Sequence, residues 1–427
     1  MRRISLGLGL VIVICQSTFA ETAAGSNTKA IVGVSVVKLD GSPAITDAVV
    51  VIEGDRIAAV GPASTTKAPP GSEVIKAAGK WIVPGLMNMH VHLGLVLPGR
   101  LGAELANETD GSLALRMASN ARASLLSGTT TVRLTGESRH VDFALRQAME
   151  RGEADGPRIF TAGELVGVTG GHGSGRTGAG NDGPDEFRKA VRREIFAGAD
   201  WIKIAISGGI ADTHGSIAAS AMTREEMAAV IDTAHRHDIK VTAHSGSPVA
   251  TEEAVDLGLD CVEHGYFLTP EVLHKMKQKG VWLVPTIVVS QPTAMEFFRK
   301  IGSPDWYLAR VESVGKQHWA SLQGAIKEGV KIALGTDQFP FEPNDGTTAT
   351  IREAQYYVQA GMTPLQALRA ATIDAATLLG TADRLGSIET GKFADLLIVD
   401  GNPAIDITAL RTIRVVMKSG RVYRSNL

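Results

Sequence analysis

Cysteine is nearly absent from this chain of 427 residues, which contains only Cys15 and Cys261. Cys15 lies in an apolar stretch near the N-terminus, so a chain that loses this stretch keeps one cysteine and can form no internal disulfide. Aromatic residues are only 5% of the chain, whereas glycine occurs 47 times. This balance is typical of many tight turns rather than of an aromatic-rich binding surface. The formal net charge of -2 gives no indication of nucleic acid or an anionic membrane as a partner.

The N-terminal apolar run, Ile4–Cys15, is too short for a transmembrane helix, which needs roughly 20 residues. Arg2 and Arg3 precede this run, and a short polar stretch that ends in small residues follows it. This order is typical of a secretory signal. We therefore predict a signal peptide over residues 1–20 and an exported protein, periplasmic or secreted. An N-terminal membrane anchor is the alternative.

The remaining chain has β-rich ends and a long alternating middle. Residues 28–83 and 381–427 contain short β-branched strands with tight turns, and we assign both ends to one small β domain. Residues 84–380 alternate short apolar strands with amphipathic helices. Eight such units predict an α/β fold with a closed (β/α)8 TIM barrel. A doubly wound open sheet is the alternative, but no GxGxxG segment follows a strand to support it. After the opening strand near residue 86, we expect strands at Thr130–Leu134, Arg158–Ala162, Trp201–Ser207, Lys240–His244, Asp260–His264, Val281–Thr286 and Lys331–Asp337.

Polar residues recur where these strands end. Side chains two residues apart on a strand point to the same side, so His90 and His92 project into one space. In WIKIAIS the three isoleucines form one face, which leaves Lys203 on the inner face. Each polar strand end alone has a structural explanation, such as a capped turn or a paired lysine. Together they predict a site, because the carboxyl ends of barrel strands form the active-site face. The residues concerned are His90, His92, Lys203, His244, His264 and Asp337.

Four imidazoles and one carboxylate are suitable ligands for one or two zinc-like divalent ions. The ammonium form of Lys203 cannot bind a metal. This lysine could contribute only as a free amine, or as the carbamate that it forms with carbon dioxide. A carbamate has two oxygens and could bridge two cations about 3.5–4 Å apart.

The motifs resemble those of the amidohydrolase superfamily, in its binuclear-metal branch with imidazolonepropionase-like, prolidase-like and ochratoxinase-like members. The resemblance covers nearly the whole mature chain, and it implies that the small β domain is a β-sandwich. The matching segments are PGLMNMHVH, WIKIAISGG, TAHSG, VEHG, LGTDQ and GSIETGKFADLLIVDGNP.

For the site, the resemblance implies two divalent ions, with Zn²⁺ expected, and a carbamate on Lys203 between them. His90, His92 and Asp337 would hold the more buried ion, and His244 and His264 the more exposed one. A metal-bridging hydroxide would be the nucleophile, with Asp337 as the general base. The implied reaction is amide hydrolysis of N-acyl amino acids or dipeptides, of carboxypeptidase or amidase type, with ochratoxin-A-like substrates among the candidates.

Substrate contacts are expected from the glycine-rich loop Gly163–Pro184, which follows the third strand and should lie over the site as a lid. Its polar candidates are His172 and Arg176, although a solvated His172 is the alternative. Gly246 stands where several prolidase-like relatives carry a tyrosine that holds the substrate carboxylate. Tyr266 is a candidate replacement, with ordinary packing as the alternative.

Other functions stay open at this stage. A cyclic-amide hydrolase of the imidazolonepropionase type would use the same motifs. A mononuclear deaminase would leave Lys203 without a role, and a catalytically silent metal-binding protein would not need Asp337 as a base. The expected partner is a small-molecule amide or dipeptide, without nucleic acid or, after signal removal, a membrane; a homo-oligomer stays open. Many relatives have aspartate in place of Asn88. The histidines that we leave unassigned, on helical or loop surfaces, are His140, His235, His237, His274 and His318.

Overall fold

The computed structural model describes residues 28–174 and 178–427. The predicted signal peptide over residues 1–20 and the candidate Arg176 therefore lie outside the described residues. Within the described residues, no helix is both long and apolar enough to cross a membrane.

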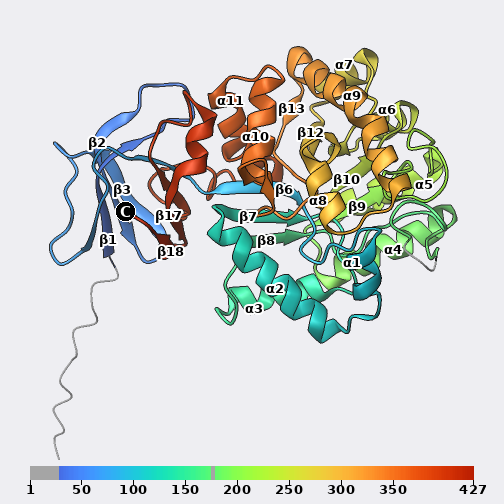
Figure 1. Cartoon of the computed structure of the whole chain (residues 1–427), viewed down its shortest axis with the longest axis horizontal. Coiled ribbons are helices and arrows are strands. Elements are labelled where there is room, and N and C mark those ends of the chain that lie inside the picture. Colours follow the sequence, from blue (N-terminus) through green and yellow to red (C-terminus); the bar gives the residue numbers. More distant parts are fainter. Residues whose placement is uncertain (1–27, 175–177) are drawn as a thin grey trace, which may run out of the picture.

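Strands from both ends of the chain form one eight-stranded sheet, which lies at one end of the molecule (Figure 1). β16 runs antiparallel to β5, with Leu397 opposite Val83, and this pairing joins the two ends of the chain. Aliphatic residues such as Ile52 and Ile398 form a core for this sheet. Its strands are β1 (Thr28–Val36), β2 (Ile45–Glu53), β3 (Arg56–Pro62), β4 (Glu73–Lys76), β5 (Trp81–Pro84), β16 (Leu396–Val399), β17 (Ile413–Lys418) and β18 (Arg421–Ser425).

In the described middle of the chain, eight strands pair in parallel with their neighbours, in the orders β6-β7-β8 and β9-β10-β11-β12-β13. A parallel bridge between Val166 and Ile204 joins the end of the first group to the second. On the other side, the backbone N–H of Met89 donates to the carbonyl of Leu334 at 2.7 Å. These strands are β6 (Leu86–Val91), β7 (Thr129–Leu134), β8 (Arg158–Thr161), β9 (Trp201–Ala205), β10 (Lys240–Ser245), β11 (Cys261–His264), β12 (Trp282–Val284) and β13 (Lys331–Ile332).

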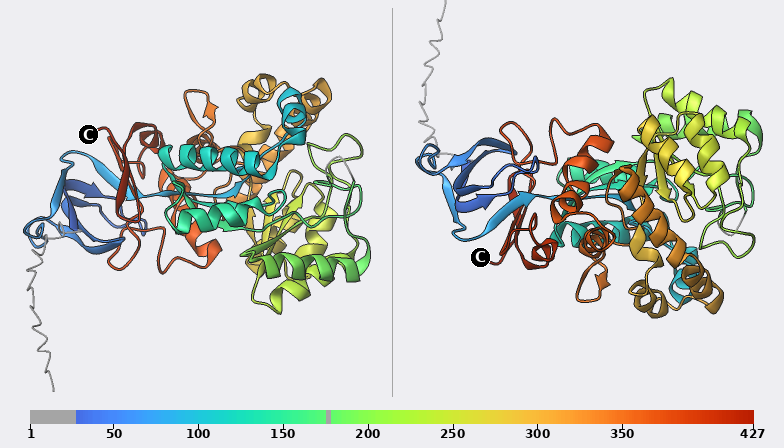
Figure 2. Two further views of the ribbon diagram at one scale, coloured as in Figure 1. Left: turned by 90° about the horizontal axis from the view of Figure 1, so that it is seen from below. Right: turned by 90° about the horizontal axis from the view of Figure 1, so that it is seen from above.

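Helices lie between and around these strands, and the two views of Figure 2 show them beside the sheet of the chain ends. Thr223 is the N-cap of α5 and forms a capping box. Thr269 is the N-cap of α7, where its side chain accepts a hydrogen bond from the backbone N–H of Val272. The helices are α1 (Arg100–Glu104), α2 (Asp110–Leu126), α3 (Val141–Glu150), α4 (Gly183–Ala197), α5 (Arg224–His235), α6 (Pro248–Asp256), α7 (Pro270–Lys279), α8 (Ala294–Lys300), α9 (Asp305–Glu328), α10 (Ala349–Gln359), α11 (Pro364–Ala370) and α12 (Ile373–Leu379).

The described residues also form short elements: the 3-10 helices η1 (Leu105–Asn107), η3 (Ile287–Ser290) and η4 (Ile407–Thr412), and the two-residue strands β14 (Pro343–Asn344) and β15 (Thr347–Thr348).

The two faces of β9 contact different surroundings. Ile202 and Ile204 belong to a large apolar cluster that includes Phe187 and Val191 of α4. Trp201 belongs to a second cluster, which includes Met89 of β6, Cys261 of β11 and residues of α12. Lys203 lies two residues after Trp201 and so points to the same side of the strand. Its side chain is 2% exposed. The alternation in the sequence therefore placed the isoleucines against the helices and the lysine on the other face of the strand.

Candidate metal centre

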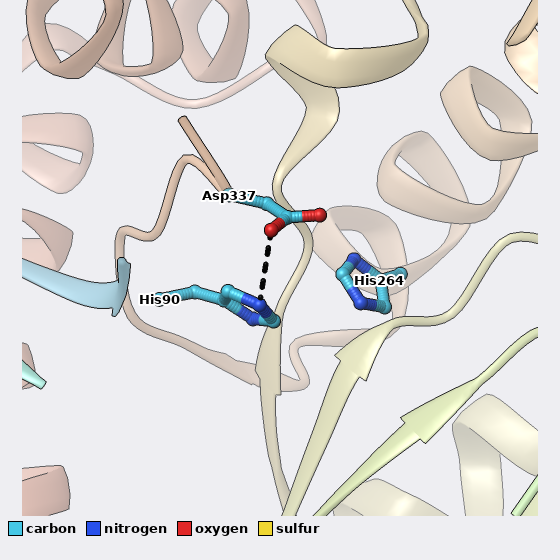
Figure 3. Close-up of side chains that lie close together, drawn as sticks. All are labelled: His90, His264 and Asp337. Carbon is cyan, nitrogen blue, oxygen red and sulfur yellow. Dashed lines mark ion pairs between the residues drawn. The ribbon is translucent and has the colours of Figure 1, made fainter. Parts of the chain in front are cut away.

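Two histidines and one aspartate meet at the end of β6. The Nε2 atoms of His90 and His92 lie 3.3 Å apart. The Oδ1 atom of Asp337 lies 3.4 Å from His90 Nε2 and 3.3 Å from His92 Nε2. His264 faces the same point, since ligand-type atoms of His90, His264 and Asp337 all lie within 4.8 Å of one another (Figure 3).

Each of the four predicted histidine ligands has one ring nitrogen in contact with a polar group that is not itself a predicted ligand. His90 Nδ1 lies 2.7 Å from Glu263 Oε2, and His92 Nδ1 lies 2.7 Å from the carbonyl of Gly136. His244 Nε2 lies 3.0 Å from the carbonyl of Gly208. His264 Nδ1 lies 2.7 Å from Thr286 Oγ1. This second contact orients the ring and selects its tautomer, as is usual for histidines that bind metals.

These contacts decide which nitrogens carry lone pairs. Carbonyl and carboxylate oxygens only accept hydrogen bonds, so Nδ1 of His90 and of His92 must donate. In the neutral rings, both Nε2 atoms then present lone pairs to each other and to the Asp337 carboxylate. Three acceptors this close repel one another unless a cation lies between them. The donor set of two imidazole nitrogens and one carboxylate oxygen therefore fits a divalent metal ion.

Without a metal ion, a proton can occupy this point. Burial disfavours a charged His92, but the hydrogen bond to Asp337 and its negative charge outweigh burial and raise the pKa of His92. The pKa of Asp337 itself lies well below its usual value, because the neighbouring His90 and His92 outweigh the effect of burial. Asp337 is therefore ionised at neutral pH.

Lys203 enters the site from the middle of β9, opposite Thr242 on β10. Among the described residues, its ammonium group has no hydrogen bond or ion pair. Burial lowers the pKa of Lys203 to about 8, although the charges of Glu263 and Asp337 oppose this shift. About a tenth of this lysine is therefore an uncharged amine at pH 7.

Glu263 and Arg133 form a buried ion pair behind His90, which the sequence analysis missed. Both side chains are 0% exposed, and the Arg133 guanidinium also donates to the carbonyl of Met89 at 2.7 Å. Thr242 Oγ1 donates a short hydrogen bond to the same carboxylate. Burial would raise the pKa of Glu263, but Arg133 and His90 lower it to about 2. The sequence does contain an indication of this role. Glu263 lies two residues after Cys261 on the same strand, so both side chains should face inward.

Two of the predicted ligands have backbones in the left-handed region, with φ of 65° for His264, the last residue of β11, and 51° for Asp337, which lies beyond the end of β13. Thr286, which contacts the His264 ring, has φ of 49°. Such values are costly for residues other than glycine and persist only where the surroundings hold them. In a regular strand, His264 would point to the opposite side from Cys261 and Glu263. The left-handed backbone turn at His264 therefore explains why its side chain points inward.

Asn88 connects the strand of the two histidines to the segment of Asp337. Its Nδ2 donates to Thr336 Oγ1 at 2.8 Å and to Thr350 Oγ1 at 3.1 Å. Its Oδ1 accepts from the backbone N–H groups of Thr336 and His90. The amide uses both its donor and its acceptor, and an ionised aspartate here could not make the two donor contacts.

His172 lies against the predicted ligand His244, with the ring centroids 3.9 Å apart and the planes 22° from parallel. Its Nδ1 lies 2.8 Å from Asp212 Oδ1, and Asp212 Oδ2 accepts from the backbone N–H of Gly209 at 2.6 Å. A Cβ atom on Gly209 would lie 2.3 Å from the His172 ring. The glycine therefore gives the ring room to pack, and His172 is a fixed part of the site.

Tyr266 packs its ring parallel to that of His264, with centroids 5.1 Å apart. Among the described residues, its hydroxyl group has no hydrogen-bond partner. A side chain at Gly246 has no space, because a Cβ atom there would lie 2.7 Å from both Cγ2 and the carbonyl oxygen of Ile217. The packing interpretation of Tyr266 thus describes its ring, while its hydroxyl is free to meet a ligand.

The prediction that His318 lies on a helix or loop surface is wrong. Its side chain, on α9, is 0% exposed. Burial lowers the pKa of His318 to about 4. The signal for this position was the apolar face of the helix, on which Val311, Val314, Leu322 and Ala325 are buried with it.

The chain is similar to known proteins over most of its length. The amidohydrolase family matches residues 81–423. The chain is 29% identical over 377 residues to the ochratoxinase of Aspergillus niger, covering 80% of this chain and 75% of the relative. It is 24% identical over 393 residues to the imidazolonepropionase of Geobacillus sp. strain WCH70, covering 82% and 84% of the two chains.

A solved structure of a Xaa-Pro dipeptidase with methionine bound in its active site is also similar. It superposes with a TM-score of 0.84 at 31% sequence identity, over 93% of this chain and 100% of that chain. Since the family match covers most of the chain and includes every strand of the candidate centre, the chain belongs to the amidohydrolase family and is a hydrolase that acts on amide bonds.

Proposed function

We propose that the chain is a binuclear, metal-dependent hydrolase that removes the C-terminal residue from N-acyl amino acids or dipeptides. The observation that carries this proposal is the convergence of His90 Nε2, His92 Nε2 and Asp337 Oδ1, all within 3.4 Å. Under this proposal the eight parallel strands form a closed (β/α)8 barrel, with the sheet of the chain ends as a β-sandwich. The contacts between β8 and β9 and between β6 and the segment after β13 support closure.

His90, His92 and Asp337 would hold the more buried ion, and His244 and His264 the more exposed one. Lys203, as its carbamate, would bridge the two. The uncharged amine is the form that takes up carbon dioxide, and the lowering of the pKa to about 8 increases the share of that form near neutral pH. Imidazole and carboxylate donors suit Zn²⁺. Divalent ions held here would lower the pKa of a bound water toward about 7 and polarise the scissile carbonyl.

The side chains of the chain itself have separate roles in this proposal. Asp337 is ionised and turned toward the centre, so it can accept a proton from water and donate it to the leaving nitrogen. Glu263, Gly136, Gly208 and Thr286 hold the imidazole rings in the orientations that binding needs.

For the substrate, the dipeptidase with bound methionine and the ochratoxinase support a compound with an amide bond to a terminal amino acid. We propose His172, held by Asp212 beside His244, and the hydroxyl of Tyr266 as substrate contacts. Arg176, in the loop predicted to lie over the site, completes this proposal. The similarity to an imidazolonepropionase supports the alternative, hydrolysis of a cyclic amide.

Metal analysis of the purified protein tests the binuclear centre. We expect about two divalent ions per chain, and we expect Lys203→Ala to lose both metal and activity. Lys331→Ala is the matched control, because Lys331 also lies on a parallel strand but is exposed. One ion with full activity in Lys203→Ala would contradict the proposal.

A substrate panel separates the remaining functions. N-acyl amino acids and dipeptides should be hydrolysed, with release of the C-terminal residue. Turnover of lactams alone would establish the cyclic-amide alternative. Bound metal without turnover of any of these compounds would identify a catalytically silent metal-binding protein.

We also propose that the protein is exported to the periplasm or secreted. The basic and apolar pattern of the N-terminal residues supports this location. Cell fractionation and mass spectrometry of the mature N-terminus test it, and a cytoplasmic protein with an intact N-terminus would contradict it.

A further inference from the structure

The buried imidazole of His318 contacts the two strand ends that carry His264 and Thr286. Its Nε2 lies 2.7 Å from the carbonyl of Pro285 and 3.1 Å from the carbonyl of His264. Carbonyl oxygens only accept hydrogen bonds, so Nε2 carries the proton and its N–H group is shared between both. The His318 ring, on α9, therefore links the end of β11 to the end of β12.

The other edge of the ring is fixed as well. His318 Nδ1 lies 2.8 Å from Ser290 Oγ, and this unprotonated nitrogen accepts the hydroxyl hydrogen. The ring also packs edge-on against Tyr266, with centroids 4.7 Å apart. Tyr266 in turn stacks on His264. His318, Tyr266 and His264 thus form one packed column of rings, and the His318 side chain is fully buried.

His318 reaches the carbonyl of His264 and the carbonyl of Pro285, which directly precedes Thr286. His264 and Thr286 both have positive φ, and a side-chain contact of 2.7 Å joins His264 Nδ1 to Thr286 Oγ1. The left-handed turn of His264 directs its Nε2 toward Asp337. Hydrogen bonds from His318 to the carbonyl of His264 and to the carbonyl just before Thr286 oppose relaxation of both turns.

We propose that His318 is a positioning residue for the metal centre, which fixes the backbone turns of His264 and Thr286 so that the His264 imidazole can bind the more exposed ion. This inference rests on the proposed binuclear function. It predicts that loss of the shared N–H group weakens metal binding although His318 touches neither metal nor substrate.

Metal titration of the whole enzyme tests this role. After chelation, each variant is titrated with Co²⁺, and the visible spectrum reports both occupancy and coordination geometry. We expect His318→Phe, which fills the space without a donor, to weaken binding of one of two ions about 10- to 100-fold. His318→Gln keeps an N–H donor and should stay within about threefold of the wild type. His237→Phe, on the surface of the loop after α5, is the matched control and should bind both ions normally.

The outcomes separate this inference from the function on which it rests. A wild-type protein that binds no metal would overturn the proposed function. A wild-type protein with two ions and a folded His318→Phe with unchanged affinity and spectrum would overturn the positioning role alone. Equal weakening in folded His318→Gln and His318→Phe would also overturn it, because the shared N–H group would then not be the cause.

If His318→Phe does not fold, the Ser290→Ala variant tests the positioning role instead. This variant keeps the imidazole but removes its Nδ1 partner, and we expect about threefold weaker binding of the same ion. Unchanged binding in Ser290→Ala would then overturn the proposal.

Discussion

Glu263, on β11, contacts His90, on β6, with Oε2 2.7 Å from Nδ1. β6 and β11, which carry these residues, are not hydrogen-bonded neighbours in the described sheets. The contact therefore links two separate strands through side chains alone. The same carboxylate pairs with Arg133, so one buried anion balances a buried cation and also orients a predicted ligand.

Glu263→Gln should destabilise the metal-free protein by about 3–5 kcal/mol, because it leaves the Arg133 guanidinium buried without its counter-charge. Urea unfolding measures this loss. Glu225→Gln removes an exposed carboxylate in the first turn of α5 and should change stability by less than about 0.5 kcal/mol. Equal effects of the two substitutions would show that the buried pair contributes nothing.

Lys203 should make the stability of the metal-free protein depend on pH. Its pKa is about 8 in the folded chain and 10.5 in the reference state, so the unfolded chain binds more protons between these values. The contribution of Lys203 to stability is therefore complete above pH 10.5 and is lost as the pH falls to about 8. The full difference amounts to about 3 kcal/mol.

Comparison with Lys203→Met isolates this contribution. In metal-free buffers without carbon dioxide, the variant should exceed the wild type in stability at pH 7, and the difference should shrink by pH 10. Urea unfolding at both pH values measures it, and the wild-type protein controls for the other groups that titrate. A difference that is constant over this range would contradict the burial of an unpaired lysine.

Asp212→Asn should impair substrate binding more than the chemical step. The hydrogen bond and charge of His172 outweigh burial and lower the pKa of Asp212, so this carboxylate is ionised and orients the ring strongly. Loss of one such contact should raise KM about three- to tenfold, with a smaller change in kcat. Steady-state kinetics with an N-acyl amino acid measures both. Asp182→Asn, which affects a hydrogen bond to Thr169 near the same loop, is the control.

Gly246→Ala should cost about 1–3 kcal/mol, because the new methyl group would lie 2.7 Å from the backbone oxygen of Ile217. Gly111→Ala is the matched control. Gly111 lies near the start of α2, where a Cβ atom would meet nothing closer than 4.0 Å, so this exchange should be neutral or slightly stabilising. Thermal unfolding of both variants distinguishes local crowding from a general effect of replacing glycine. A Gly246→Ala protein as stable as the wild type would show that this turn can move.

The alternation of strands and helices was predictable, because each strand is short and apolar and each helix has one apolar face. The ends of the strands were less predictable. The strand expected over Lys331–Asp337 ends at Ile332, and the one expected over Trp201–Ser207 ends at Ala205. In both, the backbone leaves the regular ladder as it approaches the centre. The positive φ of Asp337 depends on contacts with residues distant in sequence, which local patterns do not encode.

The residues predicted to face the centre were those that end strands, and the structure brings His90, His92, His264 and Asp337 to one point. The residues that hold them were missed. Arg133 has apolar neighbours on both sides in β7, which is compatible with several environments, and its partner Glu263 could be identified only in three dimensions. His318 could have been found from the spacing of its helix face.

The distance along the chain between His90 and Asp337 has a consequence for biosynthesis. The first residue of the centre leaves the ribosome long before the last, and β6 receives its contact from Leu334 only when the end of the middle segment is available. No early folding intermediate can therefore present the complete ligand set. Under the proposed function, a complete metal site can therefore form only after residues 331–337 have been synthesised and have docked against β6.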